Sequence, residues 1–330
     1  VTLFAGFTEY MPGRNRGTWS SRVSFNGTWS YPLCSLIAMG LTPLISAEWN
    51  WRVQLLIPAI LSLIATALAW RYFPESPRWL ESRGRYQEAE KVMRSIEEGV
   101  IRQTGKPLPP VVIADDGKAP QAVPYSALMT GVLLKRVILG SCVLIAMNVV
   151  QYTLINWLPT IFMTQGINLK DSIVLNTMSM FGAPFGIFID MLVMDKIPRK
   201  TMGVGLLILI AVLGYIYSLQ TSMLLITLIG FFLITFVYMY VCYASAVYVP
   251  EIWPTEAKLR GSGLANAVGR ISGIAAPYAV AVLLSSYGVT GVFILLGAVS
   301  IVVAIAIATI GIETKGVSVE SLSIDAVANK

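Results

Sequence analysis

The sequence contains no histidine, only three cysteines, and few charged residues for its length. Cys34, Cys142 and Cys242 all lie in apolar stretches and not in the close pairs that bind metals. A zinc site or a disulfide framework is therefore not expected, because both need clustered cysteine or histidine. The three thiols are interpreted as small groups that pack between helices, and no cofactor is predicted.

Charged residues make up 13% of the chain, whereas hydrophobic residues make up 55%. A soluble domain would carry about 25% charged residues. Several apolar runs approach or exceed the length of about 20 residues that a helix needs to cross a bilayer. The sequence thus predicts an all-α membrane protein in contact with lipid. The runs fall at 23–45, 53–72, 137–160, 173–194, 202–219, 223–249, 262–286 and 289–311.

The excess of basic residues, which gives a formal net charge of +6, follows the loops between these runs. Lysine and arginine gather in alternate loops, and the intervening loops hold little beyond Arg52 and Lys170. Loops rich in basic residues stay in the cytoplasm, so these loops and the C-terminal tail are placed there. This pattern accounts for the charge without a nucleic-acid partner. The basic loops carry Arg14, Arg16 and Arg22, then Arg78 to Arg136, then Lys196, Arg199 and Lys200, then Lys258 and Arg260.

A loop near the start of the chain recurs in its second half. EYMPGRNRG, from Glu9 to Gly17, shares its acid, its proline and its Arg-Gly pair with EIWPTEAKLRG, from Glu251 to Gly261. A second pair, ESPR at 75–78 and ETKG at 313–316, closes the second long apolar run after each loop. Two matches at nearly one offset indicate a duplicated chain with parallel halves.

The repeat also predicts how the chain is divided. If Glu9 corresponds to Glu251, three helices and most of a fourth are expected to precede Val1, so the sequence is interpreted as an N-terminally truncated twelve-helix protein. Such a piece is not expected to transport on its own. The expected parts are the remainder of an N-terminal bundle at 1–73, a cytoplasmic linker at 74–136, a C-terminal six-helix bundle at 137–312 and a cytoplasmic tail at 313–330.

Within the linker, apolar residues recur at helical spacing from Trp79 to Ile96, with charged residues between them. This spacing predicts one amphipathic helix on the inner membrane surface. The proline-rich stretch 99–124 is interpreted as a linker between the halves.

An arginine lies deep inside one apolar run. Arg270 is ten residues past Arg260, which places it about 15 Å into a hydrocarbon layer of about 30 Å. A charge there costs a few kcal/mol or more, so it should have a partner or face water. Asn266 lies one turn away on the same helix face. Contact with an anionic substrate, a structural ion pair and snorkelling remain open.

Other polar side chains in the apolar runs are candidates for substrate contact. Asn148, Tyr152 and Asn156 recur at every fourth position, which puts them on one helix face, and Gln151 lies beside them. Asn26 occupies the first run. Polar groups in a membrane face the helix bundle or a wet cavity, so these residues serve either as hydrogen bonds between helices or as substrate ligands.

Charged residues at the ends of the runs are candidates for a gate. Glu9 with Arg16 in the first half, and Glu251 with Arg260 in the second, form either an ion-pair latch that changes during transport or a charged loop that only sets topology. Asp195 and Arg199 occupy a tight turn between two runs. Asp190 lies about 7 Å deeper. It is a paired acid, a proton-coupling group or a residue without a role. The candidate gate consists of Glu9, Arg16, Asp195, Arg199, Glu251 and Arg260.

The sequence also bears on two other classes of protein, an enzyme and a solute sensor. An enzyme would need a catalytic pattern, yet the sequence has no HExxH, Ser-His pair or GxSxG, and Gly105-Lys106 is followed by proline and not by the hydroxyl residue of a phosphate loop. The protein is therefore not expected to be an enzyme. A sensor that binds a solute without moving it remains an alternative.

Five motifs, in order along the chain, carry a family resemblance. They are the loop 9–17, PESPRWL at 74–80, DKIPRK at 195–200, the loop 251–261 and ETKG at 313–316. On these motifs the chain resembles a major facilitator superfamily transporter, in the group that joins sugar porters and metabolite:proton symporters. It looks especially like bacterial inner-membrane metabolite transporters.

The resemblance implies two six-helix bundles, a central site and rocking alternating access. It also implies that Asp195, Arg199 and Lys200 belong to a cytoplasmic clamp that pins the eighth helix against the eleventh. Met191 and Pro198 stand where family members usually have glycine, so the clamp departs from the family pattern.

The resemblance further favours an acidic substrate. Sugar porters usually carry Gln-Gln and Tyr-Tyr patterns in the seventh helix, whereas this chain has NVVQYTLINWLPT, whose WLPT at 157–160 is similar to organic-acid symporters. Related organic-anion carriers tend to have an arginine at the position of Arg270. A guanidinium holds a carboxylate by two parallel hydrogen bonds. A sugar acid or another organic acid, taken up with protons by a monomer, is predicted, with a neutral sugar or polyol as the alternative.

Overall fold

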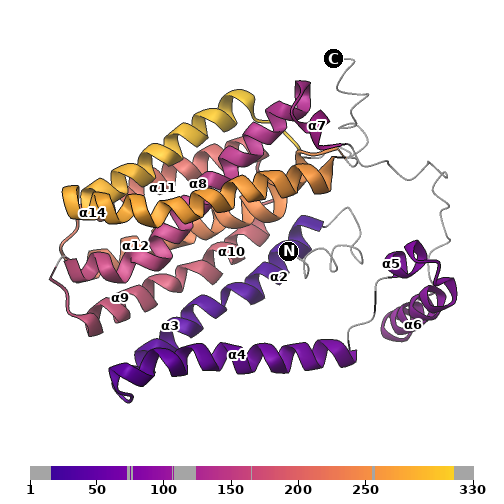
Figure 1. The fold of residues 1–330 in the computed structure, drawn as a ribbon, viewed down its shortest axis with the longest axis horizontal. Helices are drawn as coiled ribbons and strands as arrows, with labels where there is room; N and C mark the ends of the chain where they lie inside the picture. The colour runs from indigo at the N-terminus through magenta and orange to yellow at the C-terminus, as the bar shows by residue number, and fades with distance from the viewer. Residues whose placement is uncertain are drawn as a thin grey trace. The chain divides into compact units, whose positions relative to one another are not determined.

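The computed structural model describes residues 16–72, 75, 77–105, 107, 124–164, 166–254 and 257–315, and in these ranges it consists of helices and turns without a strand (Figure 1). The predicted all-α class is thereby confirmed. The chain separates into two compact units. The first unit holds the described residues of 44–119, and the second holds those of 14–43 and 120–330.

The first unit contains one helix long and apolar enough to cross a membrane. This helix, α4 (Ala47–Tyr72), continues through Pro58. Trp49 and Trp51 are exposed near its start, where Arg52 places its guanidinium 4.4 Å from the Trp51 ring centroid. Aromatic and cationic side chains at a helix end are typical anchors at a membrane–water interface.

The predicted amphipathic helix from Trp79 to Ile96 is wrong as a single element. The structure has two helices there, α5 (Pro77–Ser82) and α6 (Tyr86–Thr104), with Gly84 at φ +74° between them. Only glycine adopts this left-handed conformation without steric cost, so the chain turns at Gly84. In the longer helix, α6, Ala89 is the buried residue. This helix extends eight residues beyond the predicted end.

The second unit holds the remaining candidate spans. Five of its helical segments are long and apolar enough to cross a membrane in the described part of the chain. The run at 23–45 differs from the prediction, because Trp29 separates it into α2 (Arg16–Thr28) and α3 (Ser30–Leu41). The other helices are α7 (Tyr125–Leu128), α8 (Gly131–Thr164), α9 (Leu169–Met180), α10 (Gly182–Val193), α11 (Arg199–Ser218), α12 (Met223–Cys242), α13 (Val249–Glu251) and α14 (Lys258–Ile310).

The long helix α14 contains both of the last two predicted runs. Gly288 (φ +66°, ψ −160°) is not helical, so α14 consists of two successive helices with a kink between them. The two parts therefore correspond to the runs predicted at 262–286 and 289–311.

The helices of this unit pack as a bundle in which sequence-distant elements lie side by side. Helix α14 packs on α8 and α11, α12 packs on α10, and the early helices α2 and α3 pack on α10 and α9 (Figure 1). Glycine permits the α10–α12 contact, because a Cβ on Gly182 or Gly186 would lie 2.3 Å from a backbone oxygen of α12. Small residues let membrane helices approach in this way.

A π-helix, η2 (Tyr243–Tyr248), continues α12 and leads into α13. The rings of Tyr243 and Tyr248 stack in it with centroids 5.0 Å apart. A π-turn holds more residues than an α-turn, so it changes the direction in which the following side chains point. The following helix, α13, ends at Glu251, whose carboxylate contacts Arg199.

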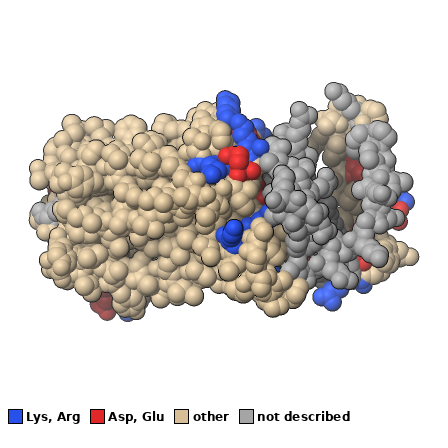
Figure 2. All heavy atoms as spheres, turned by 90° about the horizontal axis from the view of Figure 1, so that it is seen from above, with Lys and Arg blue, Asp and Glu red and all other residues tan. Residues whose placement is uncertain are grey.

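Charged side chains are unevenly distributed over the second unit. Figure 2 shows a wide expanse without lysine, arginine, aspartate or glutamate, bordered by clustered basic and acidic side chains. The ends of α10 and α13 and the starts of α8, α11 and α14 supply charges on this side, and Lys170 and Asp171 begin α9 at the opposite end. The helices thus have one charge-rich end.

Candidate gating clamp and substrate site

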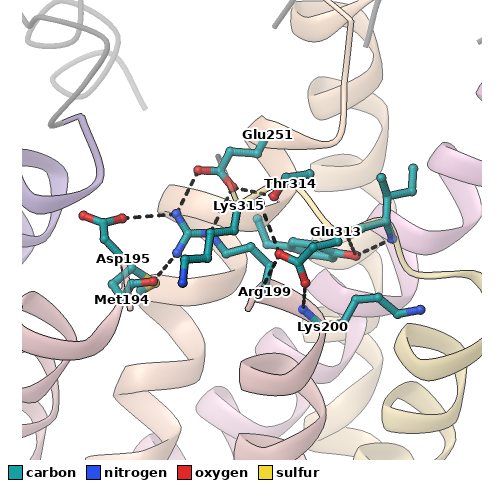
Figure 3. Close-up of polar contacts among 10 residues, drawn as sticks. Met194, Asp195, Arg199, Lys200, Glu251, Glu313, Thr314 and Lys315 are labelled. Carbon is teal, nitrogen blue, oxygen red and sulfur yellow. Dashed lines mark hydrogen bonds and ion pairs between the residues drawn. The ribbon is translucent and has the colours of Figure 1, made fainter. Parts of the chain in front are cut away.

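Arg199, the first residue of α11, is the centre of a polar cluster at the charge-rich end (Figure 3). Its side chain is 6% exposed. The guanidinium donates to Asp195 Oδ1 at 3.2 Å, to both oxygens of Glu251 at 3.1 and 3.3 Å, and to the Met194 carbonyl. A planar guanidinium can satisfy several acceptors at once, so Arg199 ties the α10–α11 turn to the end of α13.

Glu251 also receives a hydrogen bond from the chain that follows α14. The Thr314 hydroxyl donates to Glu251 Oε2 at 2.6 Å. One carboxylate therefore joins α13, α11 and the segment after α14.

Glu313 adds a second connection between the same segments. Its carboxylate accepts the backbone N–H groups of Arg199 at 2.8 Å and Lys200 at 3.1 Å, the first two residues of α11, and that of Lys315 at 3.1 Å. Free N–H groups and the helix dipole make a helix N-terminus a favourable place for an anion. Partial burial alone would raise the pKa of Glu313, but these donors and the Arg199 charge outweigh it, so the pKa lies below its ordinary value.

The chain after α14 is further attached through Tyr248. The Tyr248 hydroxyl donates to the Ile312 carbonyl and accepts the Ile312 N–H, both at 3.0 Å. The Lys315 ammonium donates to the Lys196 carbonyl. We call Asp195, Arg199, Glu251, Glu313 and Thr314 the clamp.

The structure brings three of the six predicted gating residues together, namely Asp195, Arg199 and Glu251. Arg260 lies at the start of α14, where its guanidinium is 5.2 Å from the Tyr125 ring centroid. Glu9 lies outside the described residues, and Arg16 begins α2 without a described side chain. Among the described contacts, Arg199 joins the α10–α11 turn to α13, and the expected pin between the eighth and eleventh helices stays a prediction. A gating role for all six residues stays a prediction.

Glu313 had no predicted role. It lies 114 residues from Arg199, and no local spacing reveals such a contact. The repeat of ESPR and ETKG was the available signal, because it marked the position without indicating a partner.

Arg270 and Tyr152, both predicted substrate residues, meet in the structure. The Arg270 guanidinium donates to the Tyr152 hydroxyl, which links α14 to α8. Gly269 and Gly273 make this possible, since a Cβ on Gly269 would lie 2.8 Å from Leu144 Cβ and one on Gly273 would lie 3.0 Å from the Tyr152 ring. The two helices approach closely just where Arg270 projects from α14.

Arg270 lacks an acidic partner among the described side chains. The residue is exposed in this unit. An arginine within a membrane-spanning helix that is bonded only to a phenol hydroxyl retains most of its capacity to hold an anion. The structural ion pair considered above is therefore not found within the described residues.

The other predicted substrate residues differ in their surroundings. Asn148 is 2% exposed and donates to the Leu144 carbonyl at 2.7 Å, so it lies inside the α8–α14 contact. Asn266 is exposed but donates to its own helix at Ser262. Gln151 is half-buried beside the Tyr238 hydroxyl. Asn156 and Asn26 are exposed, and no described contact joins either of them to Arg270. Their role in binding remains a prediction.

Asp190, the predicted coupling acid, lies on α10 and is fully buried. Neither carboxylate oxygen accepts a hydrogen bond of ordinary geometry from a described residue. The polar group beside it is the Cys242 thiol at the end of α12, a weak donor. The paired-acid interpretation is not met among the described residues.

Comparison with known proteins identifies the family. Residues 2–277 match the Major Facilitator Superfamily. The chain is 98% identical over 330 residues to "Putative metabolite transport protein YdjK" of Escherichia coli K12, covering all of the chain and 72% of that protein. It is 44% identical over 322 residues to "Inner membrane metabolite transport protein YdjE" of the same organism, covering 97% of the chain and 70% of that protein.

The fold has a solved counterpart. The xylose transporter XylE from E. coli, in a partially occluded inward-open conformation, superposes with a TM-score of 0.71 at 18% identity, covering 96% of the chain and 68% of that structure. At this identity the likeness is one of fold alone. The chain belongs to the Major Facilitator Superfamily, as the five motifs predicted, and it is a membrane transporter and not an enzyme.

Proposed function

We propose that this protein moves a small carboxylated metabolite, a sugar acid or another organic acid, across the bacterial inner membrane by alternating access together with protons. The names of both E. coli relatives support metabolite transport, and the name of YdjE supports the inner membrane. A monomer is sufficient for this mechanism. A neutral sugar or polyol is the second candidate substrate, and a solute sensor that does not transport is the alternative from another class.

The observation that carries the proposal is Arg270. A guanidinium at about mid-membrane depth that is bonded to a hydroxyl and to no described carboxylate has its charge available for a ligand. A substrate carboxylate would take two parallel N–H donors from it, an interaction that a neutral sugar cannot make. Tyr152 then fixes the orientation of the guanidinium.

The clamp supports the alternating-access part of the proposal. It joins the α10–α11 turn, α13 and the segment after α14 through one arginine and two carboxylates at a single end of the bundle. Ion pairs at such a position can break and form as helices move without exposing charge to lipid. We propose that the clamp holds that end closed during one half of the cycle.

The charge-rich end is proposed to face the cytoplasm. Basic residues concentrate there, as the positive-inside rule requires, and the chain leaves α14 at the same end. The C-terminal tail would then be cytoplasmic.

The test is uptake by the intact transporter in proteoliposomes with an alkaline interior, over a panel of sugars, sugar acids and aromatic acids. We expect acids alone to accumulate. Arg270→Gln should lower acid uptake by about 10- to 100-fold at subsaturating substrate, because a hydrogen bond to a charged group contributes about 1.5–3 kcal/mol. Arg94→Gln removes an arginine from an exposed pair on α6 and should leave uptake unchanged.

Three outcomes would count against parts of the proposal. Accumulation of neutral sugars that survives Arg270→Gln would favour the sugar porter. Binding of an acid without accumulation would favour a sensor. Acid uptake that is indifferent to a protonophore would remove proton coupling while retaining the acidic substrate.

A further inference from the structure

Asp190 is an acid that the clamp and the Arg270 site leave unused. It lies on α10, three residues before the end of that helix, and α12 and α2 both pack on α10. Its side chain has no exposed surface, and both of its oxygens are without a hydrogen-bond donor of ordinary geometry among the described residues. Burying an ionised carboxylate in this way is far more costly than protonating it first. The geometry points to a proton-binding site at Asp190 that is formed when α2 packs against α10.

The surroundings of Asp190 come from α12 and α2. The Cys242 thiol lies beside the carboxyl group, and the Ser21 hydroxyl of α2 lies 3.6 Å from the Cys242 sulfur. Both Ser21 and Cys242 are buried. Further along the same contact, the rings of Phe25 and Phe188 are 6.3 Å apart. Helix α2 therefore closes the apolar contact that keeps water from Asp190.

The described charged side chains on α2, on α9 and at the end of α10 are few. On α2 the described charge is Arg22, whose side chain is exposed. On α9 the charges are Lys170 and Asp171, about 30 Å away at 1.5 Å per residue. Asp195 follows the end of α10 and belongs to the clamp. The titratable group that faces Asp190 within the described residues is the Cys242 thiol.

Proton binding is thereby linked to a movement. While α2 covers α10, the carboxyl group holds a proton; if α2 moves away and water enters, the group is hydrated and releases that proton to the solution. Because the packed state binds one more proton than the open state, raising the pH favours opening. This inference rests on the proposed alternating access, in which helices of the two repeated halves, α2 and α10, separate.

The test uses Cys242 as a reporter. Cys34→Ser and Cys142→Ser, with serine in place of any cysteine of the intact transporter outside these 330 residues, leave Cys242 as the one reactive thiol. Its rate of reaction with a membrane-permeant maleimide, measured in the intact transporter between about pH 5 and pH 8, reports how often α2 leaves α10. The same rate in the Asp190→Asn background supplies the intrinsic pH dependence of the thiol. The quantity measured is the rate in the parent protein divided by the rate in the Asp190→Asn background.

We expect this ratio to rise with pH by up to about tenfold per pH unit over the range in which Asp190 titrates. Asp171→Asn, the same change near the start of α9, should follow the parent protein. A ratio that is constant with pH, or a thiol that never reacts unless the protein is unfolded, would overturn the inference. If Asp190→Asn is not monodisperse, Asp190→Ser provides the neutral comparison. The substrate does not enter this measurement, so a failed uptake panel and a failed ratio are separate results.

Discussion

Two arginines of the second unit, Arg199 and Arg270, occupy opposite electrostatic situations. Arg199 is 6% exposed and is bonded to two carboxylates and a backbone carbonyl. Arg270 is exposed and is bonded to the Tyr152 hydroxyl. The charge of Arg199 is neutralised by carboxylates of the protein and joins segments of the chain, whereas the charge of Arg270 has no such partner and is available to a ligand.

The largest expected difference between the two is in stability. Arg199→Gln leaves Glu251 without its cation in a partly buried cluster and should lower the free energy of unfolding by about 2–3 kcal/mol, since breaking a buried pair costs more than the pair contributes. Arg270→Gln should change it by less than about 0.5 kcal/mol. Thermal unfolding of the two variants in one detergent measures both. Equal losses would end the distinction between a structural and a ligand-binding arginine.

A smaller effect is expected from the helix contact beneath Arg270. Gly269→Ala places a Cβ 2.8 Å from Leu144 Cβ, so α14 must shift from α8, at a cost of about 1–3 kcal/mol. The shift moves Arg270 relative to Tyr152, and acid affinity should fall with stability. Gly263→Ala is the matched control, because a Cβ there meets nothing within 4 Å. Alanine in that exposed turn should stabilise the helix by up to about 1 kcal/mol. Equal responses at the two glycines would contradict the close approach.

The smallest expected effect concerns Glu313. It bears on the cluster around Arg199 and not on Arg270. Its pKa is lowered in the folded protein, so its stabilisation is complete above the unfolded value and is lost as the pH falls through the folded value. Glu313→Gln should cost about 0.3–1 kcal/mol at neutral pH, the usual contribution of an anion at a helix N-terminus. The difference from the parent should begin to shrink near the ordinary glutamate value of about 4.3 and vanish once the pH is below the lowered pKa of the folded protein.

Melting temperature measured from neutral to acidic pH tests this prediction. Glu98→Gln, on an exposed face of α6, is the control and should run parallel to the parent at every pH. A Glu313→Gln deficit that persists into acid would mean that the carboxylate charge is not what stabilises the start of α11.

Much of the fold could be predicted from apolar run length, because a membrane restricts spanning segments to helices. The breaks in those runs were harder to predict. Trp29 gives no turn signal, yet it separates α2 from α3. Gly84 did give one, but helical spacing on both of its sides favoured a single helix.

Single residues of the candidate sites could be predicted from the sequence, but their distant contact partners could not. Arg270 stands out in sequence because a charge in a long apolar run is costly, and its one-turn neighbour could be named. Tyr152 was a candidate for its own polarity and not as a partner of Arg270, since 118 residues separate the two. Neither Glu313 nor Ser21 was a candidate, because their contacts with Arg199 and Cys242 also join residues that are far apart in the sequence. The domain boundaries at 73, 136 and 312 stay predictions.

The π-helix from Tyr243 to Tyr248 determines the direction in which the acid of the clamp points. π-Turns of this kind correspond to one residue inserted into an α-helix, and each residue of an α-helix advances the face by about 100°. Without the insertion, Glu251 would point about a quarter-turn or more away from Arg199, and Tyr248 away from Ile312. A helix one residue shorter would still be long enough to span the bilayer. It would lack the acid that closes the cluster around Arg199, so the length of this helix, and not its apolar character, sets the Glu251–Arg199 contact.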